Sequence, residues 1–158
     1  MKAATRRDWL AHCSLLGLGL WSAGVKATAP RAPATLLVVG DSLSAEYGIA
    51  RGSGWVALLE QRLAKEKITA KVVNASISGD TTSGGRSRLP ALLAQHRPQV
   101  VVIELGGNDA LRGIPPAAIR QNLVAMVRQA RAAGAWVALL EAPVLPNYGK
   151  AYADAVAR

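Results

Sequence analysis

Short runs of β-branched and apolar residues alternate with segments of helical periodicity, and this alternation constrains the fold more than any other feature. The continuous runs predict strands buried on both faces, at residues 35–39, 70–74, 99–105 and 135–140. Helical spacing predicts helices at residues 55–65, 88–95 and 116–133, with a further one starting at 148. Strands and helices in this order form βαβ crossovers, so we expect an α/β fold with a parallel sheet covered on both faces.

One predicted helix contains a proline, and another has a periodic apolar face. Pro90 falls in the first turn of the helix predicted at 88–95, a position where proline is tolerated. The helix at 116–133 places five apolar side chains on one side and ends before Gly134; they are Ile119, Leu123, Met126, Val127 and Ala130.

Composition excludes several classes of protein and of binding site. The 158 residues are 51% hydrophobic and 18% charged, which suits one packed domain rather than a disordered chain. One cysteine, Cys13, excludes an internal disulfide framework and a multi-cysteine zinc site. The net charge of +9 is not gathered in a Lys/Arg block, and no aromatic platform or motif indicates nucleic-acid binding.

The first 29 residues resemble an export signal. Arg6 and Arg7 belong to a basic start, and residues 9–25 contain no charged side chain. The arginine pair is similar to a twin-arginine signal, with an ordinary signal or an uncleaved anchor as alternatives. We expect a periplasmic or secreted protein without stable membrane insertion once the signal is removed. The domains expected are a signal at 1–29, a linker at 30–34 and one folded domain at 35–158.

Polar and glycine-rich loops follow three successive strands. Because the carboxyl ends of parallel strands lie at one edge of a sheet, these loops should meet there. The first contains Gly40-Asp41-Ser42-Leu43-Ser44, the second Ser78-Gly79-Asp80 and the third Gly106-Gly107-Asn108-Asp109. A serine hydroxyl, a glycine N–H and a neutral amide are groups that can attack an acyl carbon and stabilise the resulting oxyanion. Each loop alone is also explained by ordinary turn formation.

Together these residues resemble blocks one, two and three of the SGNH (GDSL) hydrolases. The similarity extends from Leu36 to Tyr152, and the stretches 73–81 and 104–109 are similar to the thioesterase, lysophospholipase and arylesterase branch. The resemblance implies a three-layer, flavodoxin-like fold and a monomeric serine esterase that needs no metal or cofactor. It implies Ser42 as nucleophile, an oxyanion hole at Gly79 and Asn108, and an acyl-binding groove beside Leu111 and Ile114. The substrate implied is a small acyl ester or thioester.

The family's fourth block, Asp-x-x-His, does not occur in these 158 residues. Without a general base a serine hydroxyl is a poor nucleophile. His12 lies in the expected signal, and His96 precedes the third strand, at the edge opposite Ser42. We therefore expect a chain truncated before the last edge strand and helix, with an exposed fourth-strand edge and apolar face.

Two other functions stay open at this point. A non-catalytic acyl- or carbohydrate-binding module could keep the oxyanion pocket without a base. Nucleotide binding at the first glycine-rich turn is less well supported, because neither G-x-G-x-x-G nor G-x-x-x-x-G-K-[ST] follows a strand.

Overall fold

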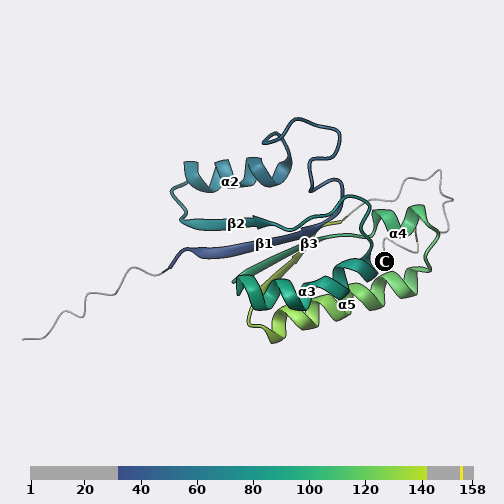
Figure 1. Cartoon of the computed structure of the whole chain (residues 1–158). Helices are drawn as coiled ribbons and strands as arrows, with labels where there is room; N and C mark the ends of the chain where they lie inside the picture. Colours follow the sequence, from purple (N-terminus) through teal and green to yellow (C-terminus); the bar gives the residue numbers. More distant parts are fainter. Residues whose placement is uncertain (1–31, 142–153, 155–158) are drawn as a thin grey trace, which may run out of the picture. The chain divides into compact units, whose positions relative to one another are not determined.

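The computed structural model describes residues 32–141 and residue 154 (Figure 1). Strands and helices alternate along this part of the chain. Their bounds are β1 Ala34–Gly40, α2 Trp55–Lys65, β2 Ala70–Asn74, α3 Thr82–His96, β3 Val100–Glu104, α4 Gly107–Leu111, α5 Pro116–Ala132 and β4 Trp136–Leu139. The four predicted strands are confirmed, with bounds that differ by no more than one residue at either end.

The four strands form one parallel sheet in the order β2-β1-β3-β4. β1 is central and pairs with β2 on one side, where Val38 is opposite Asn74. On its other side it pairs with β3, where Gly40 is opposite Glu104. The loops that follow β2, β1 and β3 therefore leave the sheet at the same edge, as predicted.

Helices cover both faces of this sheet (Figure 1). On one face Val38 and Val102 pack with Val56 of α2. The other face forms the larger core with α3 and α5, in a single cluster that includes Leu37, Val39, Val101, Ile103, Leu89, Leu93, Met126 and Ala130. The parallel sheet covered on both faces, as the alternation of strands and helices predicts, is confirmed.

The helix predicted at 88–95 begins earlier than expected. α3 starts at Thr82, and the Thr81 side chain caps it by accepting a hydrogen bond from the Gly84 N–H at 3.3 Å. The predicted start at residue 88 was wrong, because the glycine pair at 84 and 85 favours a turn when only local sequence is considered. Pro90 consequently lies inside the helix rather than in its first turn.

Tight packing explains why a glycine occurs in the first turn of α3. A Cβ atom at Gly85 would lie 2.3 Å from Leu105 Cδ1 and 3.1 Å from Met126 Cε. The helix can approach the end of β3 and the α5 helix this closely only without a side chain at Gly85.

The other helix predictions need smaller changes. α5 ends at Ala132, and the Gly134 that follows has a φ of 82°, the left-handed conformation expected after a helix. The loop expected between β3 and α5 contains the short helix α4. The export signal at 1–29 and the helix predicted from 148 lie outside the described residues, Asp154 excepted. Within the described ranges, we find no helix with the length and apolar character needed to cross a membrane.

Replacing Gly85 with alanine tests this packing, because two effects have opposite signs. Helix propensity alone would stabilise the variant by up to about 1 kcal/mol. The clash with Leu105 should instead lower the free energy of unfolding by about 1–3 kcal/mol, measured by chemical denaturation. Ser87→Ala, at an exposed position of the same helix, is the control. A Gly85→Ala protein more stable than wild type would contradict the close approach.

Candidate active site

The turn after β1 holds Ser42 between two fixed backbone segments. Asp41 is buried, and its Oδ1 accepts a hydrogen bond from the Leu43 N–H at 3.1 Å. The Ala45 N–H donates to the Asp41 carbonyl at 2.9 Å, which closes the turn. Ser42 itself is half-buried. Its hydroxyl makes no hydrogen bond to another described residue, so it is available to a ligand.

Asn108 reaches this turn from the loop after β3. Its Nδ2 donates to Asp41 Oδ2 at 2.9 Å, which places the amide beside the residue that precedes Ser42. A side-chain amide nitrogen carries two N–H donors, and the bond to Asp41 uses one of them. The second N–H can be offered to an oxygen bound next to Ser42.

Gly79 lies in the loop after β2, which also meets the end of β1. The Ile77 N–H donates to the Gly40 carbonyl at 3.0 Å and attaches this loop to β1. Gly79 has a φ of 79°, in the left-handed region that favours glycine. A Cβ there would meet nothing within 4 Å, so the conformation rather than lack of space requires glycine. Arg112 donates to the Gly79 carbonyl at 3.0 Å from the third loop.

Arg88 of α3 links the first two loops from inside. Its Nε lies 2.8 Å from Asp80 Oδ2 in an ion pair whose partners are mostly buried. The same guanidinium donates to the Ala75 carbonyl and, at 3.4 Å, to the Gly40 carbonyl. Charge-assisted bonds from one planar group thus connect the start of the Gly79 loop to the strand that leads to Ser42.

Asp109 fixes the loop that carries Asn108. The Asp109 side chain is 1% exposed and accepts two hydrogen bonds from Thr82, from its N–H at 2.8 Å and from its hydroxyl at 2.5 Å. Asn122 of α5 donates to the Thr82 hydroxyl at 3.1 Å. The short helix α4 is therefore attached to the first residue of α3, and this attachment holds Asn108, which lies on α4, in place.

Glu104, the last residue of β3, is a buried acid beside the first loop. It is 5% exposed, and its Oε2 accepts a hydrogen bond from the Ser44 hydroxyl at 2.7 Å. Burial is the largest influence and raises the pKa of Glu104 above its ordinary value of 4.5. The bond from Ser44 lowers this pKa by less, and the charge of Asp41 raises it.

The raised pKa predicts a pH dependence of stability. Native Glu104 holds its proton more tightly than the unfolded chain, so its contribution is fully present below pH about 4.5 and is lost as pH rises through the folded pKa. Glu104→Gln does not titrate, so its free energy of unfolding should improve relative to wild type as pH rises. Denaturation curves between pH 4 and about 8 measure this difference.

Gln61, an exposed residue of α2 that does not titrate, provides the control. Gln61→Ala should follow the wild-type stability curve in shape. Parallel pH profiles for wild type and Glu104→Gln would show that Glu104 has an unperturbed carboxyl.

Leu111 and Ile114 follow Asn108 closely. Leu111 ends α4 and is 60% exposed, while Ile114 is half-buried in the connection to α5. Both are therefore on the third loop, the one joined to Gly79 through Arg112.

His96 does not lie near Ser42. It is the last residue of α3, and the Gln99 N–H that follows pairs with the Thr35 carbonyl at the start of β1. Ser42 comes after the other end of β1, about 20 Å away at the rise of a β-strand. The prediction that His96 cannot act on Ser42 is confirmed. Residues 32–141 and 154 also contain no group of three or more His, Cys, Asp or Glu arranged to hold a metal ion.

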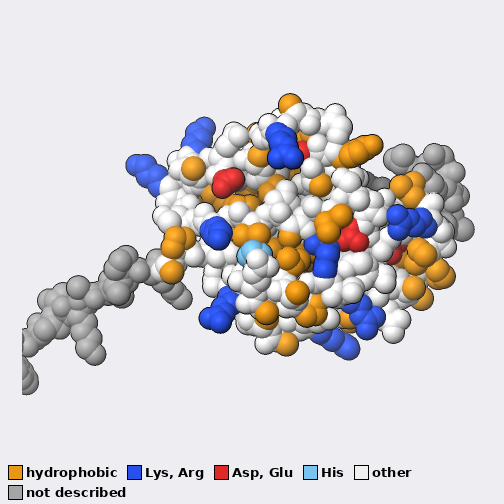
Figure 2. All heavy atoms as spheres, viewed as in Figure 1, with side chains coloured by type: hydrophobic (Ala, Val, Ile, Leu, Met, Phe, Trp, Pro, Cys, Tyr) orange, Lys and Arg blue, Asp and Glu red, His pale blue; other side chains and the backbone are white. Residues whose placement is uncertain are grey.

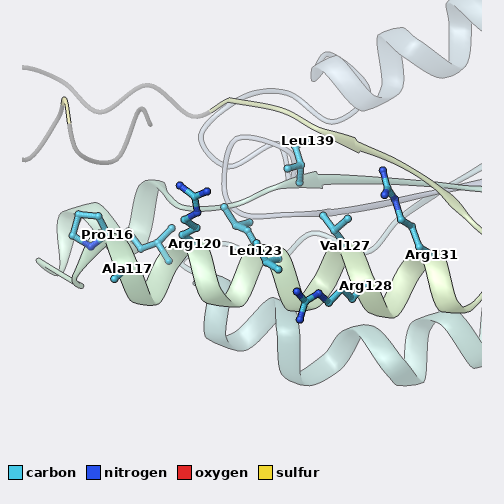
Figure 3. A pocket seen from close by; sticks show the side chains of 10 residues that line it. Pro116, Ala117, Arg120, Leu123, Val127, Arg128, Arg131 and Leu139 are labelled. Atoms are coloured by element: carbon cyan, nitrogen blue, oxygen red, sulfur yellow. The ribbon is translucent and has the colours of Figure 1, made fainter.

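A hollow of about 490 Å³ lies along α5 and β4, and its lining includes none of Ser42, Gly79 and Asn108 (Figure 3). Its lining is apolar with arginines at the rim, and includes Leu123, Val127, Leu139, Arg120, Arg128 and Arg131. β4 is an edge strand of the described sheet, and its Trp136 is 81% exposed. The described lining of the hollow includes no nucleophile or acid, so the hollow does not suit the predicted chemistry.

Lys and Arg side chains are scattered over the face shown in Figure 2, with no single block. This agrees with the charge pattern of the sequence.

Several residues of the site were missed by sequence reasoning. Asp41 and Asp109 belong to the loop motifs, but a motif does not reveal that one carboxylate binds Asn108 and the other binds Thr82. Glu104 ends an apolar run, where an acid interrupts the strand pattern, and that interruption was the available signal. Arg88 gave no signal, because its partners are mainly backbone carbonyls.

Known proteins resemble the chain in sequence and fold. A model of the GDSL-like Lipase/Acylhydrolase family matches residues 38–158. Esterase TesA of Pseudomonas aeruginosa is 58% identical over 131 residues, which cover 83% of this chain and 65% of that protein. The Escherichia coli protein named thioesterase 1/protease 1/lysophospholipase L1 is 47% identical, over 77% of this chain and 57% of that protein. A crystal structure of TesA, 60% identical, gives a TM-score of 0.76 over 77% of this chain and 68% of that chain.

The parallel sheet with helices on both faces also matches the fold of AlinE4, an SGNH-hydrolase family esterase, which is 36% identical and gives a TM-score of 0.74. The chain belongs to the GDSL-like Lipase/Acylhydrolase family. It spans less than two thirds of the length of the two relatives compared by sequence.

Proposed function

We propose that the protein is a serine esterase or thioesterase that hydrolyses small acyl esters through an acyl-enzyme on Ser42. The observation that carries this proposal is the bond from Asn108 to Asp41, which brings a neutral amide donor beside a serine with an unbonded hydroxyl. A nucleophile adjacent to a preorganised donor is the arrangement that acyl transfer requires.

The reaction would proceed in two steps on this edge of the sheet. The Ser42 hydroxyl attacks the acyl carbon and gives its proton to a general base, and the carbonyl oxygen becomes an anion. The backbone N–H groups of Ser42 and Gly79 and the free N–H of Asn108 would stabilise that oxygen. Collapse of the tetrahedral intermediate expels the alcohol or thiol, which takes the proton from the base. Water then gives a proton to the same base and attacks the acyl carbon, and the acid leaves as that proton returns to Ser42 Oγ.

The scaffold around these donors supports the proposal. Gly79 is attached on one side through Arg112 and on the other through the Ile77 bond to β1. Asn108 is held by Asp41 and by the α4 helix, which Asp109 fixes to α3. Donors fixed before the substrate arrives need no reorganisation when charge develops, and this is the main source of their catalytic effect.

The substrate class rests on the relatives and on the third loop. The two relatives compared by sequence are named as an esterase and as a thioesterase and lysophospholipase. Exposed Leu111 and half-buried Ile114 lie on the loop that carries Asn108, and we propose that they bind the acyl chain of the substrate. We propose a small acyl ester or thioester as substrate, with no resident cofactor.

The proposed reaction also requires a general base. His96 is at the wrong edge of the sheet, so we assign this role to an Asp-x-x-His segment of the kind found in the family, outside the 158 residues. The basic start and uncharged stretch of residues 1–29 support a further part of the proposal, export to the periplasm or the medium.

Substitution of the nucleophile and of the amide donor tests the function. In protein made from its complete reading frame, Ser42→Ala should abolish hydrolysis of a p-nitrophenyl acyl ester. Asn108→Ala should lower kcat by about 10²–10³-fold, the usual effect of removing one oxyanion donor. Ser83→Ala, an exposed serine of α3, should keep wild-type turnover.

Two results would contradict the proposal. Full turnover in Ser42→Ala would remove this serine as the nucleophile. A wild-type protein that binds a fatty acyl ligand without any turnover would favour the non-catalytic binding module.

A further inference from the structure

Ser44 is fixed by side chains from three other elements, although it lies only two residues from Ser42. It is 1% exposed. Its hydroxyl donates to Glu104 Oε2 of β3 at 2.7 Å and accepts from Trp55 Nε1 of α2 at 3.1 Å. Its carbonyl accepts from Asn74 Nδ2, at the end of β2, at 2.7 Å. The far end of the nucleophile turn is therefore attached to both neighbouring strands and to the helix above them.

The near end of the same turn is just as constrained. Gly40, the last residue of β1, has no room for a side chain, because a Cβ there would lie 2.5 Å from Ser44 Oγ and 3.0 Å from Glu104 Oε2. The turn folds back until the Ser44 hydroxyl contacts the Gly40 backbone. Residues 41–43, including Ser42, are confined between these two fixed points.

Glu104 is an unusual choice for this contact if its role is only to stabilise the fold. A buried carboxyl costs free energy unless its oxygens are paired. Glu104 Oε1 has no hydrogen-bond partner among the described residues, and Asp41 carries a second carboxyl close by. A leucine or valine would continue the apolar run of β3 without this cost. The acid is instead explained by its contacts with the first turn, which are the bond from the Ser44 hydroxyl and a weaker one from the Asp41 backbone.

We infer that Glu104, acting through Ser44, is a positioning residue that holds the turn carrying Ser42 in the geometry needed for attack. The expected loss of kcat rests on the proposed function, whereas the expected loss of order in the turn does not. Two backbone hydrogen bonds cross the turn. The Ala45 N–H donates to the Asp41 carbonyl at 2.9 Å, and the Tyr47 N–H donates to the Ser42 carbonyl at 3.2 Å. The exchange rates of these two amides therefore measure how well the turn is ordered.

The structural test measures hydrogen exchange of the 158-residue chain. Glu104→Leu and Ser44→Ala should each accelerate exchange at the Ala45 and Tyr47 amides. Glu104→Gln keeps an oxygen that can accept from Ser44 and should leave exchange close to wild type. The control is Gln99→Ala, which removes the 2.6 Å bond from the Thr35 N–H and so loosens β1 and β3 at their other end. It should not change exchange at these two amides.

The kinetic test uses the protein from its complete reading frame and a p-nitrophenyl ester. Glu104→Leu and Ser44→Ala should lower kcat by about 10- to 100-fold, the size of effect expected from a small misplacement of a reacting group. KM should change little, because substrate contacts are untouched. The double variant should be no slower than either single one, since both break the same link. Glu104→Gln should recover most of the turnover.

The outcomes separate this inference from the proposed function. If wild type hydrolyses esters but Glu104→Leu keeps its kcat, or loses it only in proportion to stability as Gln99→Ala does, Glu104 is a structural residue and the inference fails. If wild type hydrolyses no ester, the proposed function fails. Exchange at Ala45 and Tyr47 then still decides the positioning role, and unchanged exchange in both variants would overturn it.

Discussion

The parallel pairing of β1 with both of its neighbours is the constraint on which the site depends. The register places Val38 opposite Asn74 and Gly40 opposite Glu104, so three strands end within two residues of one another. Strands in a sheet lie about 4.8 Å apart, which puts the loops that follow them within side-chain reach. A strand order without β1 in the centre would separate Ser42 from either Gly79 or Asn108.

The fully buried polar residues of the described chain gather at this edge of the sheet. The buried polar residues of the described chain are Asp41, Ser44, Thr82, Glu104 and Asp109, and all of them lie in or beside the three loops. Burying polar groups is unfavourable unless they are hydrogen-bonded, and here they bond to one another, to Asn108 and to backbone N–H groups. The core beneath them is apolar and stabilises the fold. This stability offsets the cost of burying polar groups at the edge, where they are held in a fixed arrangement.

Much of the fold could be predicted because continuous apolar runs leave few alternatives to buried parallel strands. The start of α3 could not, since the glycine at position 85 is required by Leu105 and Met126, which are distant in sequence. The same reason applies to the site. Local motifs indicated Ser42, Gly79 and Asn108, but the bonds that order them come from residues such as Asn74, Arg88 and Glu104, which a linear pattern does not connect.

The central claim is that three loops hold Ser42, Gly79 and Asn108 around one position for an anionic oxygen. The most direct measurement is a crystal structure of the protein from its complete reading frame after reaction with a serine-directed phosphonate, whose P–O⁻ group mimics that oxygen. The account predicts phosphorus bonded to Ser42 Oγ, with the oxygen about 2.7–3.1 Å from the Ser42 and Gly79 N–H nitrogens and Asn108 Nδ2. A phosphonate attached elsewhere, or an oxygen turned away from Gly79 and Asn108, would contradict it.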